Sequence, residues 1–443
     1  MSALDAHLEN FRRLDGHAPG TLRALRERAL ARFTELGFPT IRLEDWKYTN
    51  VAPLAERAFH LADERAPRGV EALAQRARLG TGIELVFVNG RYAEALSSVG
   101  RLPSGAVIGS LDSALQRRPE LVEPHLGRYA PFDQAPESLT ALNTAFIRDG
   151  AFVYVPVGTA IDAPIHCLFL SLPADGPIVA HPRNLIVAGE GSRVTVVEQY
   201  VGERTYWTNA VTEAVVAAGA QLTHYKVQRE SADAFHVGSV AVEQAGESTY
   251  HSHAVSLGAV LARTDIATRL DAPGAACTFD GLYVARATQH ADHHTTIDHR
   301  QPRGTSRELY KGILAERATG VFNGKVYVRP HAQQSDAQQM NKNLLLSDDA
   351  QIDTKPQLEI FADDVKCSHG ATIGQLDEDA IFYLRSRGID APTARELLIF
   401  AFANELLGKI EVAALREQLT GEISSRLKGG RHMDHHHPGS HPQ

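Results

Sequence analysis

A glycine recurs at almost constant spacing through the middle of the chain. The four glycines, separated by 28, 27 and 28 residues, are Gly191, Gly219, Gly246 and Gly274, and a threonine follows each after three or four residues. We expect the pattern to continue, after an insertion, at residues 318–322 and 349–354. Self-similarity at a period of 20 to 50 residues is typical of solenoids and propellers. Two short strands per unit, with no helical periodicity between them, favour a β-helix. An immunoglobulin-like sandwich could carry similar strands but would not enforce so even a spacing.

Changes in residue composition and apolar spacing divide the chain into five parts. Helical spacing of apolar residues at 22–36, and a strand at 83–88 ended by Asn89-Gly90, describe an N-terminal region that is mostly helical. The predicted parts are an N-terminal helical region with a short strand (1–100), a connector (101–149), the β-helix core (150–375), a helical docking region (376–428) and a disordered His-rich tail (429–443). The predicted fold class is therefore mainly β, with helical regions on both sides of the core.

The end of such a core needs a cover. A terminal rung of a β-helix presents unpaired backbone groups and an apolar cross-section. Here the last strand gives way to helices, and the helix opened by Pro392 carries Leu397, Leu398, Ala401, Phe402 and Leu406 at helical spacing. This apolar face suits either the docking of another protein or packing against the chain's own core.

Composition excludes several classes of function. The 443 residues have a formal net charge of −8 and no long run of Lys or Arg, which argues against a nucleic-acid groove. The longest apolar stretches are too short for a membrane span, and the first residues lack the pattern of a secretory signal. The three cysteines are an odd number and lie about a hundred residues apart, as expected in a reducing cytoplasm.

The usual enzyme motifs are missing. No Gly-x-x-x-x-Gly-Lys-Ser/Thr occurs, and residues 320–326 only approach it with the wrong spacing, so the chain should not hydrolyse ATP. There is no Gly-x-Ser-x-Gly elbow and no Gly-x-Gly-x-x-Gly that opens a helix after a strand. We expect a protein that is not an enzyme.

One short segment does carry metal-ligand chemistry. Cys367 and His369 are two residues apart in the last predicted strand, so their side chains should point to the same face. A thiol beside an imidazole offers two ligands to iron or zinc. Two ligands do not complete a site, so the others would come from elsewhere, such as a second chain. The alternative is a small buried cysteine beside a hydrogen-bonded histidine.

Two enzymatic alternatives remain. Other histidines cluster as His251 with His253, and as His290 with His293 or His294, but we identify no carboxylate or cysteine that completes a metal set. A β-helix enzyme acting on a carbohydrate would need acidic and basic residues on one face of consecutive rungs, for which residues 263–271 are the nearest candidate.

Several longer motifs resemble a known family. Residues 317–328, residues 334–346, the segment Lys366-Cys-Ser-His-Gly370 and residues 382–389 are similar to the SufB/SufD scaffold family of the SUF iron–sulfur cluster assembly system. Residues 44–49 and 142–146 also resemble that family, so the likeness covers nearly the whole chain. Of the two branches the chain resembles the SufD type, because it has no cysteine at 331–350, where B-type chains carry one.

The resemblance implies a fold, partners and site residues. It implies a right-handed parallel β-helix that pairs with SufB through its end, and an ATP-binding-cassette ATPase, SufC, docked on the C-terminal helices, where Leu397, Leu398, Phe402 and Leu406 are the candidate contacts. It implies that His369 faces SufB as an iron or cluster ligand or as a gate for iron, with Cys367 the weaker candidate. No cofactor is expected to bind this chain stably by itself; iron or a cluster would be transient in the complex. Alone, the chain could form a homodimer through the same end.

Overall fold

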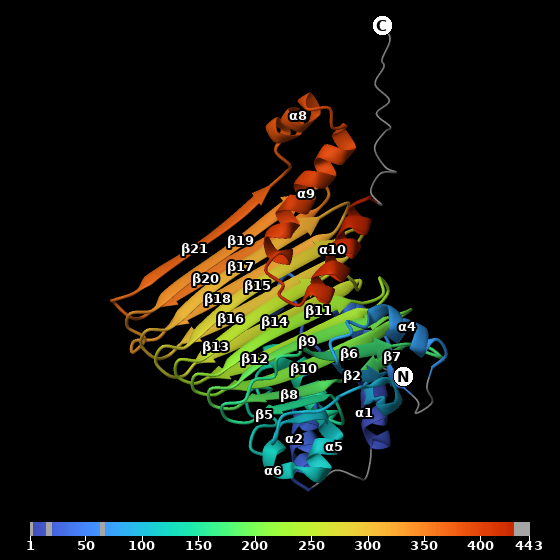
Figure 1. Cartoon of the computed structure of the whole chain (residues 1–443). Coiled ribbons are helices and arrows are strands. Elements are labelled where there is room, and N and C mark those ends of the chain that lie inside the picture. The colour runs from blue at the N-terminus through green and yellow to red at the C-terminus, as the bar shows by residue number, and fades with distance from the viewer. Residues whose placement is uncertain (1–2, 15–19, 63–66, 429–443) are drawn as a thin grey trace.

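Two parallel sheets face each other along the middle of the chain and make a β-helix (Figure 1). The structure is a computed structural model that describes residues 3–14, 20–62 and 67–428. Each rung contributes one strand to each sheet, so strands two apart in sequence are hydrogen-bonded neighbours. The prediction of a mainly β fold with a parallel β-helix core is confirmed.

The first sheet has the order β20-β18-β16-β14-β12-β10-β8-β5-β4, with β7 also paired to β10 and β1 paired to β7. Its strands are β1 His60–Leu61, β4 Val107–Ser110, β5 Ala151–Val155, β7 Ile178–Ala180, β8 Arg183–Ala188, β10 Tyr206–Val216, β12 Phe235–Gln244, β14 Leu261–Leu270, β16 His290–His299, β18 Thr319–Val328 and β20 Gln351–Ile360.

The second sheet has the order β21-β19-β17-β15-β13-β11-β9-β6-β2-β3. Its strands are β2 Ile83–Val88, β3 Arg91–Tyr92, β6 Ile165–Ser171, β9 Arg193–Gly202, β11 Gln221–Arg229, β13 Thr249–Ser256, β15 Ala276–Ala285, β17 Thr305–Leu314, β19 Asp336–Leu345 and β21 Lys366–Gly374. Alternate residues of both sheets point inward and form the largest buried apolar cluster, which includes the thiols of Cys167 and Cys277.

The four glycines of the repeat lie in the turns before β9, β11, β13 and β15 of the second sheet. Gly191, Gly219 and Gly274 have φ of 62°, 63° and 73°, a backbone region that glycine enters without steric cost. At the Gly246 turn the residue with positive φ is Glu247 instead. The predicted insertion after Gly274 is wrong. Gly304 precedes β17 only 30 residues later, whereas residues 318–322 and 349–354 lie at strands β18 and β20 of the other sheet.

The N-terminal third closes one end of the β-helix. Its helices are α1 Ala3–Arg13, α2 Gly20–Leu36, η1 Glu44–Trp46, α3 Ala52–Ala55, α4 Val70–Ala77, η2 Glu94–Leu96, α5 Leu111–Arg117, α6 Pro119–Val122, η3 Ala135–Glu137 and α7 Ser138–Ala145. Both sheets end here in antiparallel pairs, β2 with β3 and β4 with β5. The β2–β3 turn is the predicted Asn89-Gly90, with φ of 51° and 83°.

The segment around η1 ties this N-terminal part to later rungs. The Trp46 ring lies 3.7 Å from the Arg263 guanidinium on β14, and Thr49 Oγ1 donates to Asp292 on β16. Asp45 pairs with Lys325 of β18, and Glu44 pairs with Lys355 of β20. The segment therefore spans the outer face of four successive strands and reaches the last rung.

Three helices follow the last strand, as predicted: α8 Glu378–Ser386, α9 Ala391–Leu407 and α10 Ala413–Lys428. Asp377 and Asp390 cap α8 and α9 by accepting backbone N–H bonds. Side chains of α9 and α10 form a buried apolar cluster with the outer face of the second sheet, whereas α8 extends beyond the body of the molecule (Figure 1). No described helix is both long and apolar enough to cross a membrane. The predicted disordered tail, 429–443, lies outside the described residues.

Candidate functional site at the open end of the β-helix

No strand among the described residues covers the last rung. β20 and β21 are each the final strand of their sheet, so one edge of each keeps its backbone N–H and C=O groups unpaired within the sheet. Apolar side chains are exposed at this end: Ile360 is 42%, Phe361 55% and Ile373 52% accessible. This contrasts with the opposite end, where antiparallel strands and helices close the core.

Cys367 and His369 both lie on β21 and share one face, as predicted. Their register partners on β19 are Ala337 and Gln339, which are both buried inside the β-helix. The face that carries the Cys367 and His369 side chains is therefore a continuation of the interior wall, and it ends at the open rung.

Cys367 is the poorer donor of the two. It is half-buried and packs against the interior apolar cluster. Burial raises the pKa of its thiol above the ordinary value. Because the thiolate is the metal-binding form, a protonated thiol must first lose its proton. This favours a packing role for Cys367 in the isolated chain.

His369 is exposed and is the last member of a polar column. The column consists of Glu308 on β17, Gln339 on β19 and His369 on β21, which follow one another in register. Gln339 Nε2 donates to Glu308 Oε2 at 2.6 Å. Burial raises the pKa of Glu308 to about 7, so an ionisable group stands two rungs behind the exposed imidazole.

Cys367 and His369 do not by themselves make up a set of metal ligands. Among the described residues, the group of three or more donor atoms close enough to hold an ion does not include Cys367 or His369. An imidazole with one neighbouring thiol leaves at least two positions of a tetrahedral iron or zinc site to be filled. A second molecule at the open edge could supply them.

The predicted docking face on α9 is not one surface. Leu406 is 3% accessible and packs on the second sheet, which removes it from any docking surface. Phe402 is half-buried and receives Lys311 over its ring at 4.2 Å, and Leu398 is half-buried too. Of the four candidate contacts, Leu397 alone is exposed, at 46%. Apolar residues lie on nearly every side of α9, so helical spacing alone did not identify the side that faces solvent.

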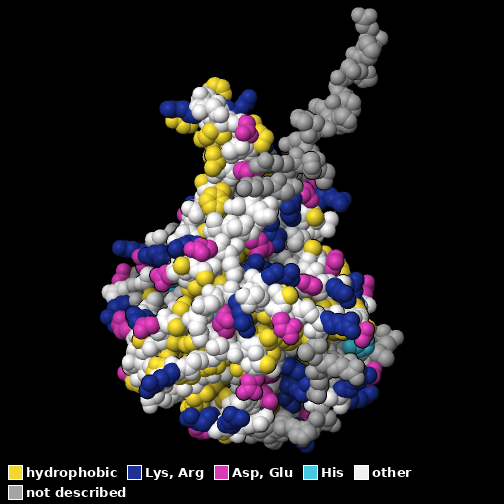
Figure 2. Space-filling model, turned by 45° about the vertical axis from the view of Figure 1, so that its right-hand side comes forward, with side chains coloured by type: hydrophobic (Ala, Val, Ile, Leu, Met, Phe, Trp, Pro, Cys, Tyr) yellow, Lys and Arg dark blue, Asp and Glu magenta, His cyan; other side chains and the backbone are white. Residues whose placement is uncertain are grey.

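Two exposed aromatic residues were missed by the sequence analysis. Phe382 and Tyr383 on α8 are 71% and 56% accessible, and apolar side chains gather at the tip that projects from the body (Figure 2). A groove beside Phe382 is lined by Ile389 and Ala391 where α8 turns into α9. The adjacent pair Phe382-Tyr383 was available as a signal, because a three-turn helix cannot easily bury two successive aromatic side chains.

The other predicted clusters have different surroundings. The expectation that no carboxylate completes a histidine set is wrong, because Asp280 lies beside His251 and His253. It belongs to the next rung, 27 residues after His253, and was not visible as a neighbour in sequence. His290 contacts Thr49 and His294 lies 3.0 Å from Asp292, whereas His293 stacks on Tyr283 inside the β-helix, so His293 shares no site with His290.

The charged residues at 263–271 do not form a carbohydrate cleft. Arg263 is buried between Asp265 and Asp292, at 2.8 and 3.0 Å, with Trp46 on its face. Arg269 pairs with Glu243. These contacts hold the N-terminal segment and neighbouring rungs together.

Comparison with known proteins agrees with this architecture. Residues 171–402 match the SUF system FeS cluster assembly SufBD core domain, and residues 3–167 match the SufBD protein N-terminal region. An iron–sulfur cluster assembly SufBD family protein of Synechocystis is 36% identical over 91% of this chain and 95% of its own length. The iron–sulfur cluster assembly proteins SufD of Escherichia coli and Bacillus subtilis are 34% and 26% identical, each over 93% of this chain and 95% of their own length. The chain therefore belongs to the SufBD family of the SUF iron–sulfur cluster assembly system.

Proposed function

We propose that this chain is a D-type scaffold subunit that pairs with a SufB-type chain through the open end of its β-helix. The observation that carries the proposal is the uncovered last rung, with unpaired strand edges beside exposed Ile360, Phe361 and Ile373. A second β-helix end of similar shape would satisfy the backbone groups and bury the apolar residues. The three free cysteines suit a reducing cytoplasm.

His369 is the side chain that this pairing would bring to the partner. It is exposed on β21, and its neighbour Cys367 is partly withdrawn into the core. We assign to His369 the role of a transient ligand to iron or to a nascent cluster, or of a gate for iron entry, with the remaining donors supplied by the SufB-type chain. Iron and cluster are cargo of the complex in this scheme.

Reconstitution of the three-protein complex tests this role. We expect His369→Ala to leave the complex intact and to lower the yield of cluster, measured as iron and sulfide per complex and by visible absorbance. His331→Ala, an exposed histidine on a turn between β18 and β19, is the matched control. An unchanged cluster yield with His369→Ala would remove His369 from the mechanism.

The ATPase is proposed to dock on the projecting α8–α9 tip. Phe382, Tyr383 and Leu397 are exposed there, and this subunit has no P-loop of its own. Because α9 also packs on the second sheet, a displacement of the tip would be transmitted through α9 to the strands of that sheet. The candidate contacts at Leu398 and Phe402 are half-buried and could contribute only at their edges.

Substitutions of exposed residues test the docking surface without removing side chains from the buried core. Phe382→Asp together with Leu397→Asp should abolish co-purification with the ATPase while SufB pairing persists. Val157→Asp is the control, because Val157 is 70% accessible and lies near the start of the β-helix, after β5. Retained ATPase binding by the double variant would refute the docking surface.

A further inference from the structure

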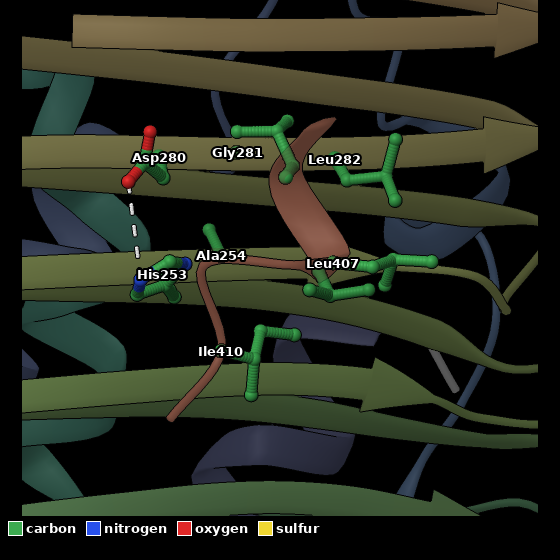
Figure 3. Close-up of a pocket in the computed structure, with 9 residues that line it drawn as sticks. His253, Ala254, Asp280, Gly281, Leu282, Leu407 and Ile410 are labelled. Carbon is green, nitrogen blue, oxygen red and sulfur yellow. Dashed lines mark ion pairs between the residues drawn. The ribbon is translucent and has the colours of Figure 1, made fainter. Parts of the chain in front are cut away.

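A second group of metal donors lies on the outer face of the second sheet. His251 and His253 are two residues apart on β13, and Asp280 on β15 is the direct register partner of His253. The loop between α9 and α10 covers this place, with Leu407 and Ile410 over it (Figure 3). The group is thus built on two neighbouring strands, with His253 and Asp280 beside the C-terminal helices and His251 partly exposed.

The donor atoms have the separations of a metal site. His251 Nε2 is 3.1 Å and His253 Nε2 3.8 Å from Asp280 Oδ2, and one atom from each residue lies within 4.8 Å of the others. With metal–ligand bonds of about 2.0–2.2 Å, donors in a tetrahedral site lie roughly 3.3 Å apart. The three side chains could therefore bind one ion after only small rotations.

One of these donors lacks a hydrogen bond. His253 is 2% accessible, and its Nε2 is buried without a hydrogen bond. The Tyr225 ring stacks on the imidazole at 4.9 Å and holds its plane. A buried nitrogen without a hydrogen bond costs free energy. A cation bound between this nitrogen and the Asp280 carboxylate would remove that cost.

The Asp280 carboxylate forms an ion pair with Lys409. Its Nζ lies 2.7 Å from Asp280 Oδ1, while 41% of its side chain is accessible. An ammonium on a flexible, half-exposed chain can move into water when another cation takes the carboxylate. Lys409 is thus placed as a competitor that an incoming ion would displace.

We propose that His251, His253 and Asp280 form a binding site for a divalent transition-metal ion. Two imidazoles and one carboxylate suit zinc or iron(II), and this set leaves a position for water or another ligand. The site lies on the outer face of the sheet, whereas Cys367 and His369 lie on the interior-facing side of the last rung, so it does not depend on the role proposed for the open end.

Zinc titration of the full-length chain tests the site. His432, His435, His436, His437 and His441 in the tail should first be replaced by alanine, because a histidine-rich segment binds metal by itself. We expect this parent to bind one equivalent of Zn²⁺ in calorimetry. Co²⁺ in the same place should give visible absorption bands typical of low coordination number.

Three variants separate the site from adventitious binding. His251→Ala and Asp280→Asn should each weaken Zn²⁺ binding by more than about tenfold, whereas the control His331→Ala should not change it. Lys409→Met should tighten binding roughly tenfold, because the competing ammonium is gone. Thermal unfolding with a chelator present checks that each variant is folded.

Either of two results would overturn the proposal. One is a parent that binds no Zn²⁺. The other is binding that survives both His251→Ala and Asp280→Asn with unchanged affinity in folded protein. His251 is partly exposed, with a side chain 28% accessible, so His251→Ala should fold even where the more buried Asp280 does not tolerate change.

Discussion

Gln339 Nε2 donates a hydrogen bond of 2.6 Å to Glu308 Oε2 inside the β-helix. Burial raises the pKa of Glu308 from 4.5 to about 7. A raised carboxyl pKa means that the folded state holds the proton more tightly than the unfolded state. The stability that this provides is complete below about pH 4.5 and is lost as the pH rises through 7.

Glu308→Gln should therefore abolish the loss of unfolding free energy that the parent protein shows as the pH rises. We expect the variant to match the parent protein near pH 5 and to exceed it by up to about 3 kcal/mol near pH 8.5, since one pKa unit corresponds to about 1.4 kcal/mol. Urea unfolding at the two pH values measures the difference. Equal gains at both values would show that ionisation of Glu308 is not the cause.

Glu198 should behave in the opposite sense. Burial alone would raise its pKa, but attraction to His224 and Lys226 and a bond from Thr212 lower it to about 2. A depressed carboxyl pKa gives stability that is present above about pH 4.5 and is lost as the pH falls towards 2. Its magnitude is about 3 kcal/mol.

The Glu198→Gln variant tests this sign. It should be less stable than the parent at pH 6, because Lys226 loses one of its two buried counter-charges, Glu198, and keeps only Glu230. The gap should narrow as the pH falls from 5 to 3. Urea unfolding across that range measures it, and a gap that stays constant would contradict the assignment.

The buried ion pair Arg183–Glu213 should contribute far more to the free energy of unfolding than an exposed ion pair does. Both side chains have no accessible surface and lie 2.5 Å apart, and Glu213 also accepts N–H bonds from Gly127 and Tyr129 of the connector. Arg183→Met leaves a buried carboxylate without its cation, so we expect a loss of about 3–5 kcal/mol in the free energy of unfolding.

An exposed pair in the same region is the control for that prediction. Arg193 and Asp162 are 2.9 Å apart with 62% and 84% of their side chains accessible. Arg193→Met should cost less than about 1 kcal/mol. Equal losses for the two arginines in denaturant unfolding would show that Glu213 finds another partner.

Two glycines make room for tyrosine rings inside the β-helix. A Cβ on Gly281 would lie 2.1 Å from the Tyr310 ring, and one on Gly312 would lie 2.3 Å from the Tyr283 ring. Gly281→Ala should destabilise the protein by about 1–3 kcal/mol through overpacking. Gly374→Ala, with nothing within 4 Å, is the control and should be neutral in thermal unfolding.

The repeating rungs and the local turns and helix starts could be predicted from the sequence. The glycine spacing predicted the rungs, and Asn89-Gly90 and Pro392 predicted a turn and a helix start that the structure confirms. The same-face arrangement of Cys367 and His369 followed from the period of a strand.

Contacts across rungs could not be predicted in this way. Asp280 meets His253 only because β13 and β15 are in register, and the offset of a rung varies by a few residues. The side of α9 that faces solvent is set by packing on the second sheet: Leu406, about two and a half turns after Leu397 and so on the opposite side of the helix, is buried, whereas Leu397 is exposed.

The open end should also govern self-association of the isolated chain. Without a partner, exposed Phe361 and Ile373 beside unpaired strand edges favour pairing with a second copy through the same surface. We expect a dimer in analytical ultracentrifugation. Phe361→Lys with Ile373→Lys should shift it to monomer, because paired ends would then bury four like charges. Val157→Lys and Phe382→Asp, which alter exposed apolar residues elsewhere, should leave the dimer unchanged. A dimer that survives the lysine pair but is lost with Phe382→Asp would place the contact at the α8 tip instead of at the last rung.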